Sequence, residues 1–160
     1  MTEYPVRQPA RWLDRDEQGA WRAFLEATRQ LFDGVDAQLQ RDAGMPHAYY
    51  EILVRLSEAP ERALRMRDLA AASLSSKSRL SHAVARLEER GWVRRTESRT
   101  DRRGQVAELT DAGFAALAAA APGHVDQVRS AVFDALTPEQ VRQLHEISTA
   151  ILEHGGHSRG

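Results

Sequence analysis

The sequence predicts a mainly α fold that carries one small β-hairpin, with long helices at both ends of the chain. Three observations support this prediction. Apolar residues recur at helical spacing along most of the chain, glycine and proline divide it into segments, and one Arg-rich stretch lies between two short β-type pieces. The 160 residues, 42% of them hydrophobic, suffice for a single domain with its own core.

The composition excludes several classes of site. The chain has no cysteine, so it can form no disulfide framework, thiolate metal site or cysteine-based redox switch. The N-terminal sequence MTEYPVRQPARWLDRDE lacks the apolar segment of a signal peptide, and no run of about 18 apolar residues occurs. We therefore expect a cytoplasmic protein, and we expect it to need no cofactor and no metal.

Basic charge is concentrated in the middle of the chain. The formal net charge is only −1, but residues 62–103 contain 12 arginine or lysine residues against five acidic ones. The remaining residues carry 10 basic and 18 acidic side chains. This distribution predicts a basic working surface on an acidic scaffold, which favours a nucleic-acid partner despite the near-neutral total.

The chain begins with a flexible arm and a long helix. Residues 1–15 show no clear period, and a helical pattern then extends from Glu17 to Arg41 with Asp16 as the candidate cap. Its apolar stripe comprises Trp21, Phe24, Leu25, Thr28, Leu31, Phe32, Val35 and Leu39. A helix of about 25 residues is roughly 37 Å long, which is more than a small core covers, so part of the stripe is expected to meet a partner chain.

Three shorter helices and a hairpin follow. The helices are expected at residues 47–58, 67–72 and 76–90. Leu64–Met66 is an extended piece between the first two, and Gly91 stops the last helix. Trp92–Val93 and Val106–Leu109 are the β-type pieces of a hairpin whose loop is polar and rich in arginine.

Two further helices complete the chain. Thr110 caps the first of them, and Pro122-Gly123 is expected to kink or split it. Thr137-Pro138 starts the second, which is expected to end near Glu153. Residues 154–160 are expected to form a disordered tail.

The helix expected at 76–90 has two different faces. Leu80, Ala83, Val84 and Leu87 fall on an inward face, whereas Ser75, Ser78, Arg79, His82 and Arg86 fall on the opposite face. Small residues near its start allow close approach to DNA, and the basic ones can donate to phosphates and base edges. Lys77 and the helix N-terminus add affinity for phosphate. The alternative interpretation is an ordinary amphipathic surface helix.

The hairpin supplies a second basic element. Six arginines crowd into 14 residues: Arg90, Arg94, Arg95, Arg99, Arg102 and Arg103. A projecting loop tipped with arginine can enter the minor groove, where the negative potential is strong. Asp101 is expected to fix one of these arginines by a bidentate pair and so to stiffen the loop. A solvated hairpin with surface arginines is the alternative.

These residues resemble the MarR family of winged helix-turn-helix regulators. The stretch Leu64–Gly113 contains three matching motifs: R-L-E-x-x-G at Arg86–Gly91, D-x-R-G at Asp101–Gly104 and L-T-x-x-G at Leu109–Gly113. Each motif is short, but their order and spacing together are specific. The helix lengths and order extend the resemblance more loosely over residues 17–153.

The resemblance implies a transcription regulator, expected to be a repressor, that binds a pseudo-palindromic operator in double-stranded DNA as a homodimer. Residues 16–45 and 110–153 would form dimerisation helices around a winged helix at 46–109, within one domain spanning 16–153. The candidate DNA-binding residues, from the basic faces and the resemblance together, are Ser76, Lys77, Ser78, Arg79, His82, Arg86, Arg95, Arg99, Arg102 and Arg103. Within this set Arg103 would reach the minor groove, with Asp101 stabilising the wing.

The resemblance also implies an effector. Many members bind a small aromatic or phenolic ligand between the dimerisation helices and the winged helix, and the ligand releases DNA. The candidate lining residues here are Trp21, Phe24, His47, Tyr49 and Tyr50, with ordinary core packing as the alternative. The branch of the family that senses oxidants through a reactive cysteine is excluded, because the chain has none.

The two alternative functions are an enzyme and a winged helix that binds a protein. The six histidines are scattered without the spacing of a zinc protease, and neither G-x-S-x-G nor a phosphate-cradling glycine loop occurs, so we expect no enzyme. A winged helix that binds a protein instead of DNA is the second alternative. Such a surface should be more apolar and less rich in arginine than residues 62–103 are.

Overall fold

The computed structural model describes residues 10–73, 76–97 and 104–157. Along these ranges the elements are α1 (Arg15–Ala43), α2 (His47–Glu58), η1 (Pro60–Arg62), β1 (Ala63–Arg65), α3 (Met66–Ala72), α4 (Lys77–Glu89), β2 (Val93–Glu97), β3 (Gln105–Leu109), α5 (Asp111–Ala131), η2 (Phe133–Ala135) and α6 (Pro138–His157). The expected mainly α fold with a small β-hairpin is confirmed.

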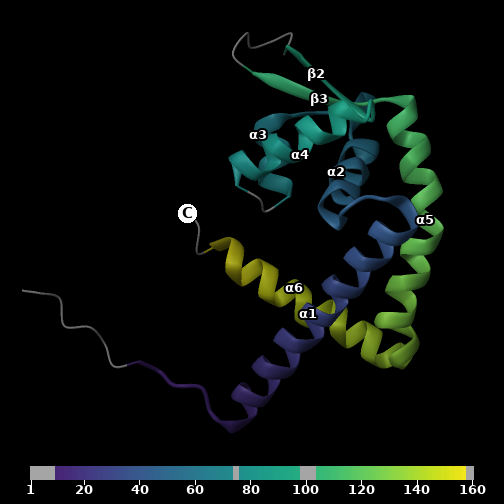
Figure 1. The fold of residues 1–160 in the computed structure, drawn as a ribbon. Coiled ribbons are helices and arrows are strands. Elements are labelled where there is room, and N and C mark those ends of the chain that lie inside the picture. Colours follow the sequence, from purple (N-terminus) through teal and green to yellow (C-terminus); the bar gives the residue numbers. More distant parts are fainter. Residues whose placement is uncertain (1–9, 74–75, 98–103, 158–160) are drawn as a thin grey trace, which may run out of the picture.

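The molecule has a small head and three long helices (Figure 1). The reading head comprises α2 to β3, residues 47–109. Helix α5 leaves the reading head and packs along α1, and α6 turns back from the far end of α5 (Figure 1). None of the helices in the described ranges is long and apolar enough to cross a membrane.

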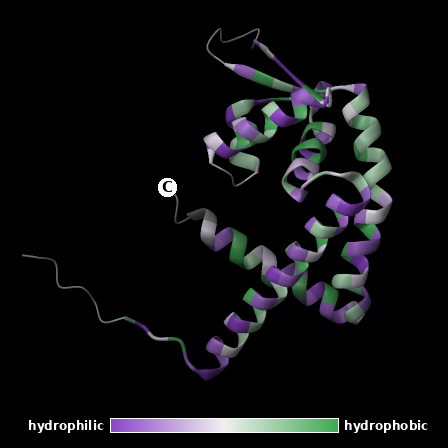
Figure 2. Ribbon diagram, in the orientation of Figure 1, coloured by the Kyte–Doolittle hydropathy of each residue, from purple (hydrophilic) through white to green (hydrophobic). Residues whose placement is uncertain are grey.

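The core lies in the reading head and at the end of α1 that joins it. The largest side chains with less than 2% exposure are Leu39, Met45, Leu53, Leu56, Leu69, Leu87 and Val84. They come from α1, α2, α3 and α4 and from the turn after α1. The α-helices of the reading head therefore pack around one shared apolar core. Figure 2 shows apolar and polar bands alternating along α1 and α6, the pattern of amphipathic helices.

Helix α1 begins earlier than expected. Its cap is Asp14 rather than Asp16, and the Asp14 carboxylate accepts hydrogen bonds from the backbone N–H groups of Asp16 and Glu17 at 2.8 Å each. The Glu17 side chain accepts the Asp14 N–H in return, which completes a capping box. At the other end Gly44, with φ 61°, closes the helix in the left-handed conformation that glycine adopts without strain.

The hairpin is part of a three-stranded antiparallel sheet with the order β1-β3-β2. The extended piece expected at 64–66 forms β1, which pairs with β3 so that Leu64 lies opposite Ala107. Met66 is not part of this strand but begins α3. Across the hairpin, Val93 pairs with Leu109 and Glu97 with Gln105. The wing therefore projects from a sheet that is anchored to the first helix of the helix-turn-helix.

The last two helices differ from expectation, since α5 is not split and α6 is longer. Pro122 lies inside α5, but the helix is not split there and continues to Ala131. Gly123 packs closely on α1, since a Cβ added at Gly123 would lie 2.9 Å from Nε2 of Gln38. The helix therefore packs on α1 directly after Pro122, and it continues although proline removes one internal hydrogen bond. Helix α6 extends to His157, beyond the expected end near Glu153.

The start of α5 is joined tightly to the base of the wing. Thr110 accepts the N–H of Gly113 at 3.0 Å, as expected of a cap, and its hydroxyl donates to the carbonyl oxygen of Gly91 at 2.7 Å. Gly113 is buried there, and a Cβ at this position would overlap the carbonyl oxygen of Trp92 and lie 2.8 Å from Cδ1 of Leu109. The glycine of the L-T-x-x-G motif is required by this close approach.

We expect Gly113→Ala to lower the free energy of unfolding by about 2–3 kcal/mol, because the added methyl group meets a backbone oxygen that cannot move aside cheaply. Urea denaturation checks this. The matched control is Gly19→Ala in α1, where nothing lies within 4 Å of the new Cβ. That variant should gain about 0.5–1 kcal/mol from helix propensity. Equal effects at the two positions would contradict the role given to Gly113.

Candidate nucleic-acid interface

Helix α4 presents a polar and basic face to solvent. Its buried residues are Leu80, Val84 and Leu87, as the sequence predicts. The exposed candidates on it and at its cap are Ser76, Lys77, Ser78, Arg79, His82 and Arg86. Ser76 is the N-cap, and its hydroxyl oxygen accepts the N–H of Arg79 at 3.3 Å. Ser75 lies outside the described residues.

The exposed face of α4 changes along its length. Small side chains and Lys77 stand at its start, where a helix presents unpaired N–H groups. Further along, Arg86 forms an ion pair with Glu89 at 2.7 Å, and this hydrogen bond raises the pKa of Arg86 above its ordinary value. The first half of α4 is therefore the part best suited to approach an acidic surface closely, whereas Arg86 already has an acidic partner.

Arg95 of the hairpin is held against α4. The carboxylate of Glu88 accepts the backbone N–H of Arg95 at 2.9 Å and its Nε–H at 2.6 Å. Both side chains are only about one quarter exposed, 28% for Arg95 and 27% for Glu88. The guanidinium group therefore joins the wing to α4 and stays partly exposed to solvent. The motif glutamate that makes this contact was not singled out from the sequence.

Two more arginines of the predicted basic cluster are engaged within the protein. Arg94 forms a bidentate pair with Glu108 on the neighbouring strand, with nitrogen–oxygen distances of 2.7 and 3.1 Å. Arg90 donates to the carbonyl oxygen of Gly44 at 2.9 Å, and its guanidinium carbon lies 4.9 Å from the centre of the Trp92 ring. The candidates Arg99, Asp101, Arg102 and Arg103 lie outside the described residues.

A cavity of about 430 Å³ lies between α2 and α5. Of the five predicted ligand-binding residues, His47 and Tyr50 line it, together with His124 of α5. The His124 ring centre is 4.3 Å from that of Tyr50 and 6.0 Å from that of His47. Sequence reasoning missed His124, because nothing in the order of residues along the chain places it beside His47.

The other three predicted ligand-binding residues lie elsewhere. Trp21 and Phe24 stack on each other at 6.4 Å on α1 and are about half exposed, and neither lines this cavity. Tyr49 faces the opposite side of α2, where the guanidinium carbon of Arg90 lies 6.0 Å from its ring centre. Glu51, Val54, Arg55 and Glu58 complete the lining of the cavity, which is therefore more polar than the predicted aromatic set implies.

The histidine pair in this cavity is unusual in its environment. Nδ1 of His124 is buried and has no hydrogen-bond partner among the described residues. Burial lowers the pKa of His124, and the nearby His47 lowers it further. The backbone N–H of His47 donates to Asp36 at 2.8 Å, a bond that lowers the pKa of the Asp36 carboxyl group. In the described part of the chain no group of three or more His, Cys, Asp or Glu residues is arranged to hold a metal ion.

Comparison with known proteins identifies the family. The MarR family model matches residues 43–104. The chain is 56% identical to Sco3205, a MarR family transcriptional regulator from Streptomyces coelicolor solved in complex with DNA, with a TM-score of 0.87 over 91% of each chain. The chain belongs to the MarR family. It is also 43% identical to AbsC, another MarR family regulator from Streptomyces coelicolor, with a TM-score of 0.85 over 91% of this chain and 97% of AbsC.

A more distant neighbour supports the fold alone. The transcriptional regulator BldR from Sulfolobus solfataricus is 24% identical, with a TM-score of 0.77 over 89% of this chain and 99% of that one. A comparison with curated proteins found no match. Together with the winged helix-turn-helix described above, the family membership makes this MarR protein a DNA-binding transcription regulator.

We expect Glu88 and Arg95 to act on DNA binding as one unit. Glu88→Ala and Arg95→Ala should each lower the affinity for DNA, because both changes remove the same link between α4 and the wing. For the same reason, the double variant should bind DNA with about the affinity of the single variant that binds less tightly. The coupling free energy in such a cycle should be about 1 kcal/mol. Fluorescence anisotropy measures the affinities. A further loss on adding Arg95→Ala to Glu88→Ala would instead show that Arg95 contacts DNA.

We expect the folded protein to lose stability as the pH falls below the ordinary histidine pKa of 6.5. The lowered pKa of His124 means that the unfolded chain takes up the proton first, so acidification favours unfolding. Denaturation between about pH 7 and 5.5 should show this, and His124→Gln should flatten the profile. Parallel profiles for parent and His124→Gln would contradict the assignment.

Proposed function

We propose that this MarR protein acts as a homodimer that binds a pseudo-palindromic operator and represses transcription until a small aromatic or phenolic ligand releases it. The observation that carries the proposal is the exposed polar and basic face of α4, on a helix whose opposite face is buried and whose start is capped by Ser76. As a regulator of transcription it would act in the cytoplasm, where bacterial DNA is found.

The proposed docking places the first half of α4 in the major groove. Ser76, Lys77 and Ser78 allow close approach and supply donors to phosphate, while Arg79 and His82 reach base edges. Arg86 lies further along the same helix and is a phosphate candidate if it leaves Glu89. In this proposal Arg103 reaches the minor groove, Arg102 contacts a phosphate and Asp101 stabilises the wing. Arg99 is a further DNA-binding candidate in the same stretch. Arg95 supports this arrangement from within, through Glu88.

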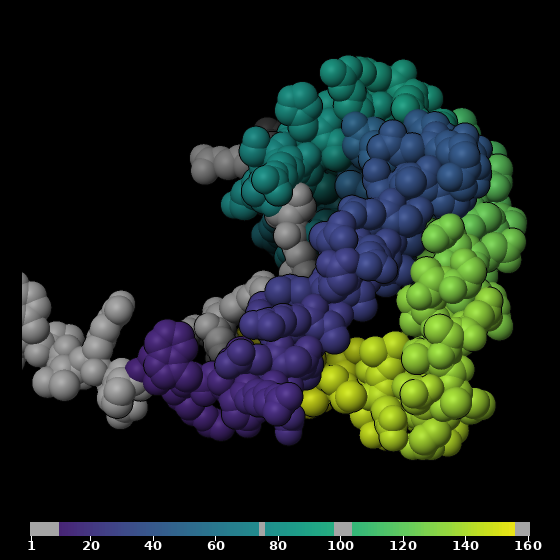
Figure 3. All heavy atoms as spheres, turned by 60° about the horizontal axis from the view of Figure 1, so that its bottom comes forward, coloured from purple at the N-terminus to yellow at the C-terminus, as the bar shows by residue number. Residues whose placement is uncertain are grey.

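The proposed dimer covers apolar surface that a single chain leaves exposed. The large apolar side chains exposed on α1 and α6 are Trp21, Phe24, Leu25, Phe32, Leu144, Ile147, Ile151 and Leu152. Figure 3 shows the N-terminal half of α1 uncovered by the rest of the chain on the side facing the viewer. Two-fold pairing through these helices would bury the stripe and set two α4 helices about one DNA turn apart, or a multiple of that.

The proposed effector site is the cavity of His47, Tyr50 and His124. It lies between α2 of the reading head and α5, so a ligand there contacts both parts whose relative position sets the spacing of the two reading heads. Trp21 and Phe24 could join such a site only from the partner chain. Tyr49 is better explained as a support for Arg90 than as a ligand contact.

The deciding experiment is binding to DNA from upstream of the protein's own gene, compared with scrambled DNA at two salt concentrations. We expect specific binding by two protomers that weakens steeply with salt. Arg79→Ala and His82→Ala should change sequence preference by about 1–3 kcal/mol, because each removes a donor to a base edge. Weak binding without sequence preference at every DNA tested, including sites from genome-wide selection, would favour a protein-binding winged helix.

Substitutions in the wing test these roles, because the direction of the change in DNA affinity distinguishes between them. Arg103→Ala should weaken operator binding while the helix content stays unchanged. Asp101→Ala should also weaken binding, although it removes a negative charge from a surface that meets phosphates. Anisotropy titrations of the two variants measure both effects. Tighter binding by Asp101→Ala would show that charge alone governs this loop and that Asp101 does not organise it.

A further inference from the structure

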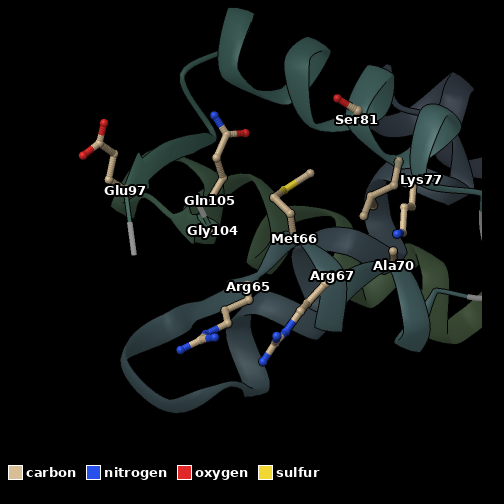
Figure 4. Close-up of a pocket in the computed structure, with 10 residues that line it drawn as sticks. Arg65, Met66, Arg67, Ala70, Lys77, Ser81, Glu97, Gly104 and Gln105 are labelled. Atoms are coloured by element: carbon tan, nitrogen blue, oxygen red, sulfur yellow. The ribbon is translucent and has the colours of Figure 1, made fainter. Parts of the chain in front are cut away.

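Two cavities bordered by the reading head carry opposite charge. The larger, of about 560 Å³, lies on the side proposed above to meet DNA, beside α3, the start of α4 and the base of the wing (Figure 4). Its charged lining residues are Arg65, Arg67, Lys77 and Glu97. The cavity of about 430 Å³ between α2 and α5 is lined instead by two carboxylates, Glu51 and Glu58, and one basic side chain, Arg55. The balance of charge in this second cavity disfavours an anion.

Aromatic rings from three helices meet at one end of the cavity between α2 and α5. Its lining follows one face of α2 from His47 to Glu58, and His124 is contributed by α5. The rings of Tyr50 and His47 lie beside His124, as described above. The centre of the His47 ring is also 5.6 Å from that of Phe32 on α1. A flat aromatic ligand can therefore stack at the end of the cavity where α2 begins.

Glu51 is the carboxylate closest to these rings along α2. It lies one helical turn after His47, on the same face of the helix. Its side chain is partly buried, and among the described residues it forms neither an ion pair nor a hydrogen bond. Shielding an unpaired carboxylate from water costs free energy, and a cationic ligand beside it would offset that cost.

The basic groups of the cavity do not neutralise its carboxylates. Burial lowers the pKa of His124, and Nδ1 of this ring has no partner in the described part of the chain, so no carboxylate there favours its protonated form. Arg55 is exposed and pairs with neither Glu51 nor Glu58 within the described ranges. Because acidic groups outnumber basic ones, a cationic ligand is preferred over an anion of the same size.

We propose that this cavity binds a small aromatic amine in its protonated form, with the ammonium group on Glu51 and the ring against Tyr50 and His124. The inference rests on the effector site proposed above and specifies the charge of its ligand. An ammonium group there combines a charge-assisted hydrogen bond with cation–π attraction, and both are stronger away from bulk water. A phenol would supply the ring alone, whereas an aromatic carboxylate would be repelled by Glu51. The volume suits a small molecule.

The test uses three probes that share a phenyl group: phenethylamine, phenethyl alcohol and phenylacetate. At equal ionic strength, phenethylamine should raise the midpoint of thermal unfolding of the full chain, the alcohol should raise it less, and phenylacetate should leave it unchanged. Glu51→Gln should weaken binding of the amine by roughly ten- to hundredfold, because it removes a charge-assisted hydrogen bond. This variant should then respond to the amine no more than to the alcohol.

Arg55→Gln is the matched comparison. Arg55 lies one helical turn beyond Glu51 on the same wall of the cavity, and the two side chains share the lack of an ion pair among the described residues. Removing its positive charge should leave binding of the amine unchanged or make it tighter. The unfolding midpoint of each variant without a probe shows whether that variant is folded.

Three outcomes would overturn the proposal. A larger shift with phenylacetate than with the amine, lost in Arg55→Gln, would show a site for an anion. Equal shifts with all three probes, or none with any, would show that the cavity does not select a cation. An amine effect that is unchanged in Glu51→Gln would show that the amine binds elsewhere. Anisotropy with DNA from upstream of the protein's own gene separates this inference from the proposed function, because an amine that binds through Glu51 without changing DNA affinity supports the ligand class and contradicts its role in release.

Discussion

The close approach of α5 to the backbone of Trp92 is the constraint on which the rest of the structure depends. At this point the end of α4, the first strand of the wing and the start of α5 meet within a few residues, and Thr110 bonds to the carbonyl oxygens of Gly91 and Trp92. The absence of a side chain at Gly113 permits the contact. The direction in which α5 leaves the reading head is fixed there, and α5 in turn determines where α1 and α6 lie.

Acidic residues hold several arginine side chains in place within residues 62–103, although the net charge of that segment is positive. Glu88 holds Arg95 between α4 and the wing, and Glu108 holds Arg94 across the hairpin. The Arg95–Glu88 pair is about one quarter exposed and therefore contributes more than an exposed pair, whereas Arg94 stays 65% exposed in its pair with Glu108. A basic surface built in this way presents fewer unpaired arginines than its composition suggests. Lys77 and Arg79 are exposed at the start of α4.

The sequence predicted the local elements well, because their causes are local. The inward residues of α4 and the cap at Thr110 follow from periodicity and capping chemistry, and the structure confirms them. The hairpin is also confirmed, but its first strand covers Val93–Glu97, so residues expected in the loop pair with the second strand. The errors arose where a neighbour decides the outcome. Asp14 rather than Asp16 caps α1 because Glu17 returns its hydrogen bond. Pro122 does not split α5, and α1 packs closely on this helix at the next residue, Gly123.

The candidate DNA-binding and ligand-binding residues show the same division between what short sequence segments predict and what packing decides. By itself the sequence determined which side chains of α4 face solvent and which family the chain resembles, since both depend on residue order within short segments. Only the tertiary structure decided that Arg95 contacts Glu88, that His124 rather than Trp21 or Phe24 joins His47 and Tyr50, and that Arg65 and Arg67 line a cavity with Lys77. The physical reason is that these groups come from different elements, and which of them meet depends on how helices and strands pack, which no local pattern records.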